Sequence, residues 1–181
     1  RGSDEGNAIV VRPGSKIAIV GVAEESSSIF HQCAIYQLDA NLSPDTSFGG
    51  SGNGRILTNF TGGITDGAIC NAAAVDGDKL YVGGVLLRDN DVDRDMVVAR
   101  LSPTGVLDPA FGTIGPGTSV VDPGDSGSTT VFESVKTMGL QNGRVVVAGP
   151  SEPVSGATPS NSDMILVRLV DEDFIFANSF Q

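Results

Sequence analysis

Tryptophan is absent from this chain of 181 residues, histidine occurs once and cysteine twice. Two cysteines are too few for the disulfide framework of a small secreted domain and too few for a zinc site. With His31 as the single histidine, a histidine-based metal site has no support, and a Ser-His-Asp triad would have to recruit that residue. We therefore expect no catalytic centre of these kinds, and we expect His31 to lie in a loop without a chemical role.

Long apolar runs and basic residues are also scarce. No run approaches the roughly 20 apolar residues that a membrane helix needs. The chain has 11 Lys and Arg against 22 Asp and Glu, which gives a net charge of −11 and a pI of about 4.3. An acidic surface repels phosphate groups, so nucleic acid and anionic lipid are poor partners. We expect no nucleic-acid binding and no membrane insertion.

The two cysteines, Cys33 and Cys70, could form one bridge or remain free thiols. The sequence does not show whether they meet. Small thiols are among the most frequently buried side chains, and this tendency favours two buried, unbridged cysteines over a disulfide. Free thiols are therefore our expectation here.

Glycine, in contrast, is abundant, with 24 residues, while 40% of the chain is hydrophobic and 18% charged. This composition fits neither a disordered chain nor a membrane protein and is typical of a turn-rich β protein. The length allows one domain with a real core. We expect residues 1–6 to be a residual tag or a disordered end and residues 7–181 to form a single repeat domain.

The chain repeats itself. An apolar run, a turn, a basic residue and a second apolar run ending in glycine recur in residues 7–21, 70–84 and 135–149. The basic residues Lys16, Lys79 and Arg144 lie 63 and 65 residues apart. Two further blocks follow in the same order, an apolar block at 33–38, 97–101 and 165–169, and an Asp-x-x-Phe-Gly block at 45–49 and 108–112, with a weaker copy at 177–180. The predicted repeat units are 7–69, 70–131 and 132–181.

Each unit is expected to contain four antiparallel strands. The apolar runs are short, rich in Val and Ile, and bounded by Gly, Asp, Asn and Pro. In the first unit we expect strands at Ala8–Val11, Lys16–Val22, Cys33–Leu38 and Arg55–Asn59, and in the second copy the last of these falls at Ser119–Asp122. Asp-Gly and Asn-Gly pairs supply the tight turns in the later units. The Asp-x-x-Phe-Gly block is expected to be a structured loop whose Phe packs inward.

No segment has convincing helical periodicity, since the best exception, Thr130–Leu140, breaks at Gly139 and aligns with a strand. Four antiparallel strands in a unit of about 63 residues predict an all-β fold of β-propeller-type blades. An open β-sandwich is the competing fold, although it would not need the strict repeat.

The second unit resembles the delta-60 repeat family, a bacterial repeat of unknown function that is regarded as a β-propeller blade. The resemblance rests on two stretches, Lys-Leu-Tyr-Val-Gly-Gly at 79–84 and Asp-Met-Val-Val-Ala-Arg-Leu-Ser-Pro-Thr-Gly-Val-Leu-Asp-Pro-Ala-Phe-Gly at 95–112. It extends from about Asn7 to Phe180. The first unit has Tyr36-Gln37 where Arg100 stands in the second, and the third lacks the Leu-Asp-Pro-x-Phe-Gly core after Leu169. The resemblance implies a propeller architecture and an exported, periplasmic or surface setting in bacteria, and it brings no catalytic residue.

Three units are fewer than the 4 to 8 blades of a closed propeller. Open blade faces would expose large apolar patches, which soluble monomers rarely tolerate. We therefore expect self-association, or a missing partner segment that completes the ring.

One acidic cluster could hold a cation. Alternating carboxylates in a loop can converge on calcium, and here they are Asp89, Asp91, Asp93 and Asp95. Arg94 and Arg100 stand where an EF-hand would have Gly and Glu, so this is not an EF-hand loop. A solvated acidic turn is the favoured interpretation, with calcium as the alternative and no other cofactor expected.

Arg100 and Arg168 occupy equivalent ends of third strands. They could form a ring that binds an anionic ligand. Pairing with a carboxylate of the next loop, such as Asp108, is favoured instead.

The repeat without a nucleophile or acid/base set favours a protein that is not an enzyme. We expect a structural or interaction module, part of an exported or surface bacterial propeller, that presents loops to a protein or a glycan. The alternatives are a carbohydrate-binding or hydrolytic propeller that uses acidic loop residues, and a calcium-stabilised repeat.

Overall fold

The computed structural model describes residues 3–24, 31–61, 66–88, 93–112, 117–122, 131–153, 163–170 and 173–180. These residues form strands, turns and one short 3-10 turn at Pro13–Ser15, and no α-helix lies among them. None of the described segments is a helix long and apolar enough to cross a membrane. The all-β prediction is confirmed.

The first unit is a four-stranded antiparallel sheet in the order β1-β2-β3-β4. Its strands are β1 (Glu5–Arg12), β2 (Lys16–Glu24), β3 (His31–Leu38) and β4 (Arg55–Thr58). The predicted strands are confirmed at all four places. β1 begins earlier than expected because Glu5 and Gly6 pair with Val22 and Gly21 of β2.

The second unit repeats this arrangement. Its strands are β5 (Gly67–Asp76), β6 (Lys79–Arg88), β7 (Asp93–Leu101) and β8 (Thr118–Val121), each paired antiparallel with the next. The third unit has β10 (Thr137–Gln141), β11 (Arg144–Pro153), β12 (Asp163–Val170) and β13 (Asp173–Phe180), paired in the same way. Three four-stranded antiparallel units of the propeller-blade type are therefore present.

The third unit differs from the sequence alignment at its end. Residues 177–180, expected to be a weak copy of the Asp-x-x-Phe-Gly loop, belong to the strand β13, which pairs with β12. The alignment was wrong because this unit lacks the Asp-x-x-Phe-Gly sequence that forms the loop in the first two units. A short strand that the sequence did not predict, β9 (Val131–Glu133), pairs with β11 and contacts β7 through Phe132 and Arg94.

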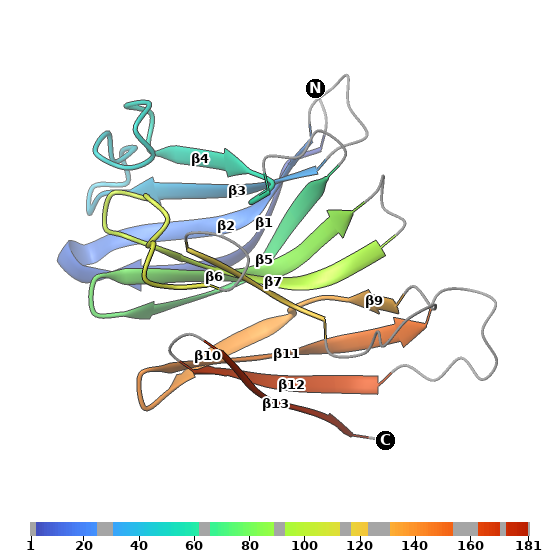
Figure 1. Ribbon diagram of the computed structural model, residues 1–181. Helices are drawn as coiled ribbons and strands as arrows, with labels where there is room; N and C mark the ends of the chain where they lie inside the picture. Colours follow the sequence, from blue (N-terminus) through green and yellow to red (C-terminus); the bar gives the residue numbers. More distant parts are fainter. Residues whose placement is uncertain are drawn as a thin grey trace.

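The three units lie one after another, with the second between the first and the third (Figure 1). β5 packs against β1 on one side and against β10 on the other, so the first strand of every unit is an inner strand. The hydrophobic cores lie between the units. One joins the first and second units and includes Val20, Ile35 and Val82. The other joins the second and third and includes Met96, Val135 and Val147. Core between neighbouring sheets is what propeller blades require.

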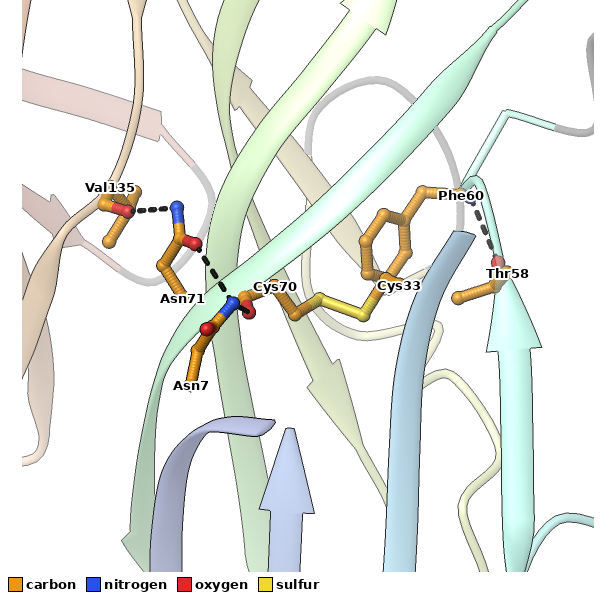
Figure 2. Close-up of a disulfide and its surroundings, with 7 residues drawn as sticks. All are labelled: Asn7, Cys33, Thr58, Phe60, Cys70, Asn71 and Val135. Atoms are coloured by element: carbon orange, nitrogen blue, oxygen red, sulfur yellow. Dashed lines mark hydrogen bonds between the residues drawn. A yellow bond between two sulfur atoms is a disulfide. The ribbon is translucent and has the colours of Figure 1, made fainter. Parts of the chain in front are cut away.

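Cys33 and Cys70 are bonded, which corrects the expectation of two free thiols. Cys33 lies on β3 and Cys70 on β5, with their Cα atoms 5.0 Å apart. Burial tendency gave the wrong prediction because it describes each cysteine alone. The repeat places these two strands face to face across the core between the first and second units, where both residues are fully buried (Figure 2).

Candidate binding site at the inner strands

The inner strands of the first two units carry the same irregularity. A bulge places Asn7 between the Gly6–Gly21 and Ala8–Val20 pairs of the first unit. In the second unit a bulge places Asn71 between the Cys70–Gly84 and Ala72–Gly83 pairs. The two asparagines are therefore equivalent, and they occupy the one position of each inner strand that has no partner across the ladder.

The bulges fit only because a glycine lies opposite each of them. A Cβ on Gly21 would lie 1.8 Å from the carbonyl oxygen of Glu5, and a Cβ on Gly84 would lie 1.9 Å from that of Ile69. The third unit repeats the contact, since a Cβ on Gly149 would lie 1.7 Å from the carbonyl oxygen of Ser134. The glycine that ends each apolar run in the repeat thus permits a close approach of two backbones.

The bulge asparagines link neighbouring units. Asn7 donates a hydrogen bond from Nδ2 to the carbonyl oxygen of Cys70, at 3.0 Å. Asn71 donates the equivalent bond to the carbonyl oxygen of Val135, at 2.9 Å. Figure 2 shows the Asn7 amide directed to Cys70 and the Asn71 amide directed to Val135, each in the next unit. In the third unit the equivalent position is occupied by Lys136.

A cavity of about 470 Å³ opens where the inner strands begin. We call it the axial cavity, because inner strands surround the axis of a propeller. All three units and β9 contribute to its wall. Its polar lining includes Asn7, Glu24, His31, Asn71, Arg94, Lys136 and Glu152, and its apolar lining includes Val22, Val85 and Phe132.

Charged groups of both signs face this cavity. His31 Nε2 lies 3.1 Å from Glu24 Oε1, and both side chains are about one third exposed. The backbone N–H of Ser3 donates a hydrogen bond to Glu24 and lowers the pKa of that carboxyl, with the nearby His31 acting in the same direction. The guanidinium of Arg94 lies over the ring of Phe132, 4.6 Å from its centre. His31 is therefore part of a polar site at the start of β3. The prediction that it lies in a loop was wrong.

The predicted calcium ligands fall only partly within the described residues. Asp89 and Asp91 lie outside them, while Asp93 begins β7. Asp95 is buried and forms an ion pair with Arg88, at 2.7 Å. Carboxylate oxygens of Asp95, Asp122 and Glu133 lie within 4.8 Å of one another. The sequence did not predict that Asp122 and Glu133 lie beside Asp95. The calcium site stays a prediction.

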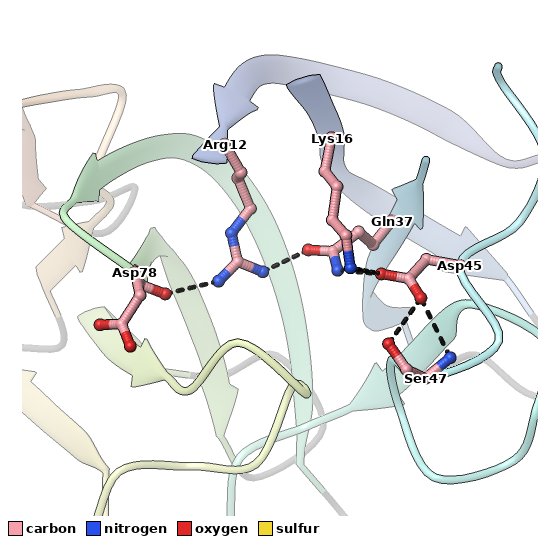
Figure 3. A network of polar contacts seen from close by, with 6 residues as sticks. All are labelled: Arg12, Lys16, Gln37, Asp45, Ser47 and Asp78. Carbon is pink, nitrogen blue, oxygen red and sulfur yellow. Dashed lines mark hydrogen bonds and ion pairs between the residues drawn. The ribbon is translucent and has the colours of Figure 1, made fainter. Parts of the chain in front are cut away.

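At the other end of the inner strands, an aspartate anchors the Asp-x-x-Phe-Gly loop. Asp45 accepts bonds from Lys16 and Gln37, each at 2.6 Å, and from the backbone and hydroxyl of Ser47 (Figure 3). The Lys16 ammonium is the main reason that the pKa of Asp45 lies far below its usual range. Phe48 of the same loop is fully buried, as predicted.

The second unit uses Asp108 in the same way. Lys79 and Arg100 each lie 3.0 Å from its carboxylate, and Lys79 is the main cause of its lowered pKa. The predicted pairing of Arg100 with Asp108 is confirmed. Arg168 has no equivalent aspartate and donates to Gln141 instead, at 3.2 Å. Arg100 thus holds the loop of the second unit through Asp108, whereas Arg168 contacts the end of β10.

One family model matches the chain. Residues 78–111 match "Domain of unknown function (DUF5122) beta-propeller". The match runs from the turn before β6 to Phe111, so it covers β6, β7 and the Asp-x-x-Phe part of the loop in the second unit. It supports a β-propeller-like repeat for the second unit, in agreement with the sheet order. No curated protein matches the chain.

The asparagines of the axial cavity were not among the residues predicted from the sequence. Counting back from Lys16 and Lys79 aligns Asn7 with Cys70 and so hides their equivalence. The turn between the first two strands contains three residues in the first unit, where Arg12 pairs with Lys16, and two in the second, where Asp76 pairs with Lys79. An asparagine recurring 64 residues later was the signal that could have found them.

Proposed function

We propose that this chain is a non-catalytic binding module, built from delta-60-like propeller repeats, that holds a glycan in the axial cavity. The observation that carries the proposal is the mixed lining of this cavity by side chains from all three units. Its volume of about 470 Å³ lies in the range of small-molecule sites. Amide, carboxylate, imidazole and cationic groups can all exchange hydrogen bonds with sugar hydroxyls.

The glycan is favoured over a protein partner by the shape of the site. A protein surface needs a broad contact area, whereas this site is a hollow lined by all three units. Carboxylates of Glu24 and Glu152 accept hydrogen bonds, and Lys136 and Arg94 donate them. Both signs of charge are present, so the site suits a saccharide with hydroxyl groups and an occasional charged substituent.

An exported or cell-surface setting in bacteria is part of the proposal. The Cys33–Cys70 disulfide supports it, because stable disulfides persist mainly in oxidising compartments. The resemblance to the delta-60 repeat points in the same direction.

The test is binding of defined oligosaccharides, first on a glycan array and then by calorimetry on any hit. We expect Lys136→Ala and His31→Ala each to weaken binding about tenfold, which corresponds to about 1.4 kcal/mol. Arg144→Ala is the control, because this exposed residue begins β11 outside the cavity wall. An array without hits, or binding that both cavity variants leave unchanged, would contradict the proposal.

The same ligands test the proposal that the module is not catalytic. A bound oligosaccharide should be recovered intact after long incubation with the protein. Release of shorter sugars, abolished by Glu24→Gln or Glu152→Gln, would replace the proposal by the hydrolytic alternative. In that case, two carboxylates would flank the bond that is cleaved.

Calcium-dependent stabilisation is the second candidate function, and the meeting of Asp95, Asp122 and Glu133 favours it. Carboxylate oxygens are the ligands that calcium prefers. If calcium binds the folded chain there, saturating calcium should raise the melting temperature, and Asp122→Asn should reduce the effect. Equal melting temperatures in calcium and in chelator would dispose of this candidate.

A further inference from the structure

The two contacts between units within this chain use the same positions. The first unit presents Ala18, Val20, Cys33 and Ile35 to the second, and the second presents the equivalent Tyr81, Gly83, Met96 and Val98 to the third. We call this the forward face. On the receiving side, Leu80 and Val82 of the second unit correspond to Val145 and Val147 of the third. We call this the backward face.

The forward face of the third unit is open. Its residues at the equivalent positions are Val146, Ala148, Met164 and Leu166. Met164 is 55% exposed and Leu166 39% exposed, and a shallow hollow of about 400 Å³ lies beside Val146, Ala148 and Leu166. These side chains are as apolar as those that are fully covered at the same positions in the first unit.

The backward face of the first unit is open as well. It carries Ile17 and Ile19 at the positions of Leu80 and Val82, and it adds Ile9 and Val11 from β1. Ile9 is 65% exposed and Val11 70% exposed, whereas their equivalents Ala73 and Val75 pack against the core between the first and second units. The two open faces lie at opposite ends of the row of units (Figure 1).

The polar contacts between units also leave two groups of opposite charge, one on each open face. Asn7 and Asn71 each donate to a backbone carbonyl of the next unit, and Lys136 holds the donor position in the third unit. The carbonyl equivalent to those of Cys70 and Val135 is that of Gly6, at the backward face of the first unit. Glu5 is exposed beside it. The third unit therefore offers a cation, Lys136, and the backward face of the first unit offers a carboxylate, Glu5.

We propose that a second copy of this chain docks on these open faces. The forward face of the third unit packs on the backward face of the first unit of the second copy, and Lys136 reaches Gly6 and Glu5 there. The same contact formed twice closes a ring of six units, within the blade numbers of known propellers. This interface uses the same positions as the two contacts between units that the chain already contains. The second copy also completes the wall around the axial cavity, although docking does not depend on what this cavity binds.

The first experiment measures the mass in solution by light scattering after size exclusion, over a range of concentrations. We expect twice the chain mass of 18.5 kDa. Val11→Glu and Leu166→Glu, one on each face, should each give the monomer mass. Val106→Glu is the matched control, because this valine is 64% exposed in a loop of the second unit. Circular dichroism of the monomeric variants verifies that they remain folded.

The second experiment locates the contact. Met164 is equivalent to Cys33, and Gly6 is equivalent to Cys70, so the pair should lie across the new interface as the native disulfide lies across the first one. A Cβ on Gly6 meets only the side chain of Ile19, at 3.4 Å. A mixture of the Met164→Cys and Gly6→Cys chains should form a covalent dimer on mild oxidation. With Leu42→Cys in place of Gly6→Cys, the dimer should not form.

The outcomes decide the proposal. A monomer at every concentration, or a dimer that survives both face variants, overturns it. A series of masses that grows with concentration overturns the closed ring, because it would mean that copies add without closure. Glycan binding is measured separately, so a monomer that still binds sugar rejects this inference and leaves the proposed function standing.

Discussion

Arg12 donates a hydrogen bond to Gln37 and so supplies from β1 the guanidinium that Arg100 supplies from β7 in the second unit. Arg100 lies over the ring of Phe111, 4.9 Å from its centre, and Arg12 lies over the equivalent Phe48, at 5.9 Å. Arg12 also donates to the carbonyl oxygen of Asp78 in the second unit, at 2.7 Å (Figure 3). The departure of the first unit from the repeat pattern is therefore compensated by a neighbouring strand.

This compensation predicts that substitutions at Arg12 and Gln37 have non-additive effects on the free energy of unfolding. Gln37→Arg should lower the free energy of unfolding by about 1–3 kcal/mol, because two guanidinium groups would compete for one buried site. Arg12→Val should cost a similar amount, since Gln37 loses its donor. The double variant again places a single guanidinium at this site, as Arg100 does in the second unit, so its cost should be smaller than the sum by at least about 1 kcal/mol. Urea unfolding of the four proteins measures this, and additive costs would refute the compensation.

The disulfide predicts a large effect of reduction. It closes a loop with a sequence separation of 37 residues, for which the chain-entropy relation gives about 4 kcal/mol. We expect Cys33→Ser/Cys70→Ser to lower the free energy of unfolding by about 2–5 kcal/mol. The same loss should follow when the native protein is unfolded with a reductant present. A stability that does not change in either experiment would mean that the two thiols are not bonded in solution.

The loop aspartates predict a loss of stability in acid. The pKa values of Asp45 and Asp108 are lowered in the folded protein by Lys16 and Lys79, so the unfolded chain binds protons more readily. Their contribution is complete above the unfolded pKa of about 3.9 and disappears as the pH falls through the lower folded values. The free energy of unfolding should therefore decrease steadily below about pH 4.

Asp45→Asn separates this effect from general acid denaturation. It should lower stability at pH 7 and make the decline below about pH 4 shallower. Asp76→Asn removes an exposed carboxylate from the end of β5 and is the control for net charge. Parallel pH curves for the native protein and Asp45→Asn would show that Lys16 and Asp45 do not stabilise the fold.

The glycines opposite the bulges predict a contrast between two substitutions. Gly84→Ala should cost about 3 kcal/mol, since its methyl group would overlap the carbonyl oxygen of Ile69 and force the backbones apart. Gly139→Ala meets no atom within 4 Å and should change stability little. Thermal unfolding compares the two, and equal effects would show that the bulge does not require glycine.

Local patterns accounted for the strands, the turns and the loop anchors. Lys16, Lys79 and Arg144 marked the second strand of each unit, and β2, β6 and β11 begin at these residues. The Asn-Gly pair of the third unit forms its turn with positive φ values of 53° at Asn142 and 75° at Gly143. Arg100 donates a hydrogen bond to Asp108, which lies eight residues further along the chain. Such features depend on neighbours along the chain, and the sequence displays those directly.

The repeat and its period were thus determined by the sequence alone, because spacing and alternation of apolar residues are enough to define strands and their order. Only the tertiary structure decided that Cys33 meets Cys70, that Asn7 is equivalent to Asn71, and that Glu24, Arg94 and Lys136 share one cavity. One extra residue in the first turn shifts the alignment of β1, and no local pattern reveals it. Contacts between units depend on how whole sheets pack, which the repeat makes possible but does not specify residue by residue.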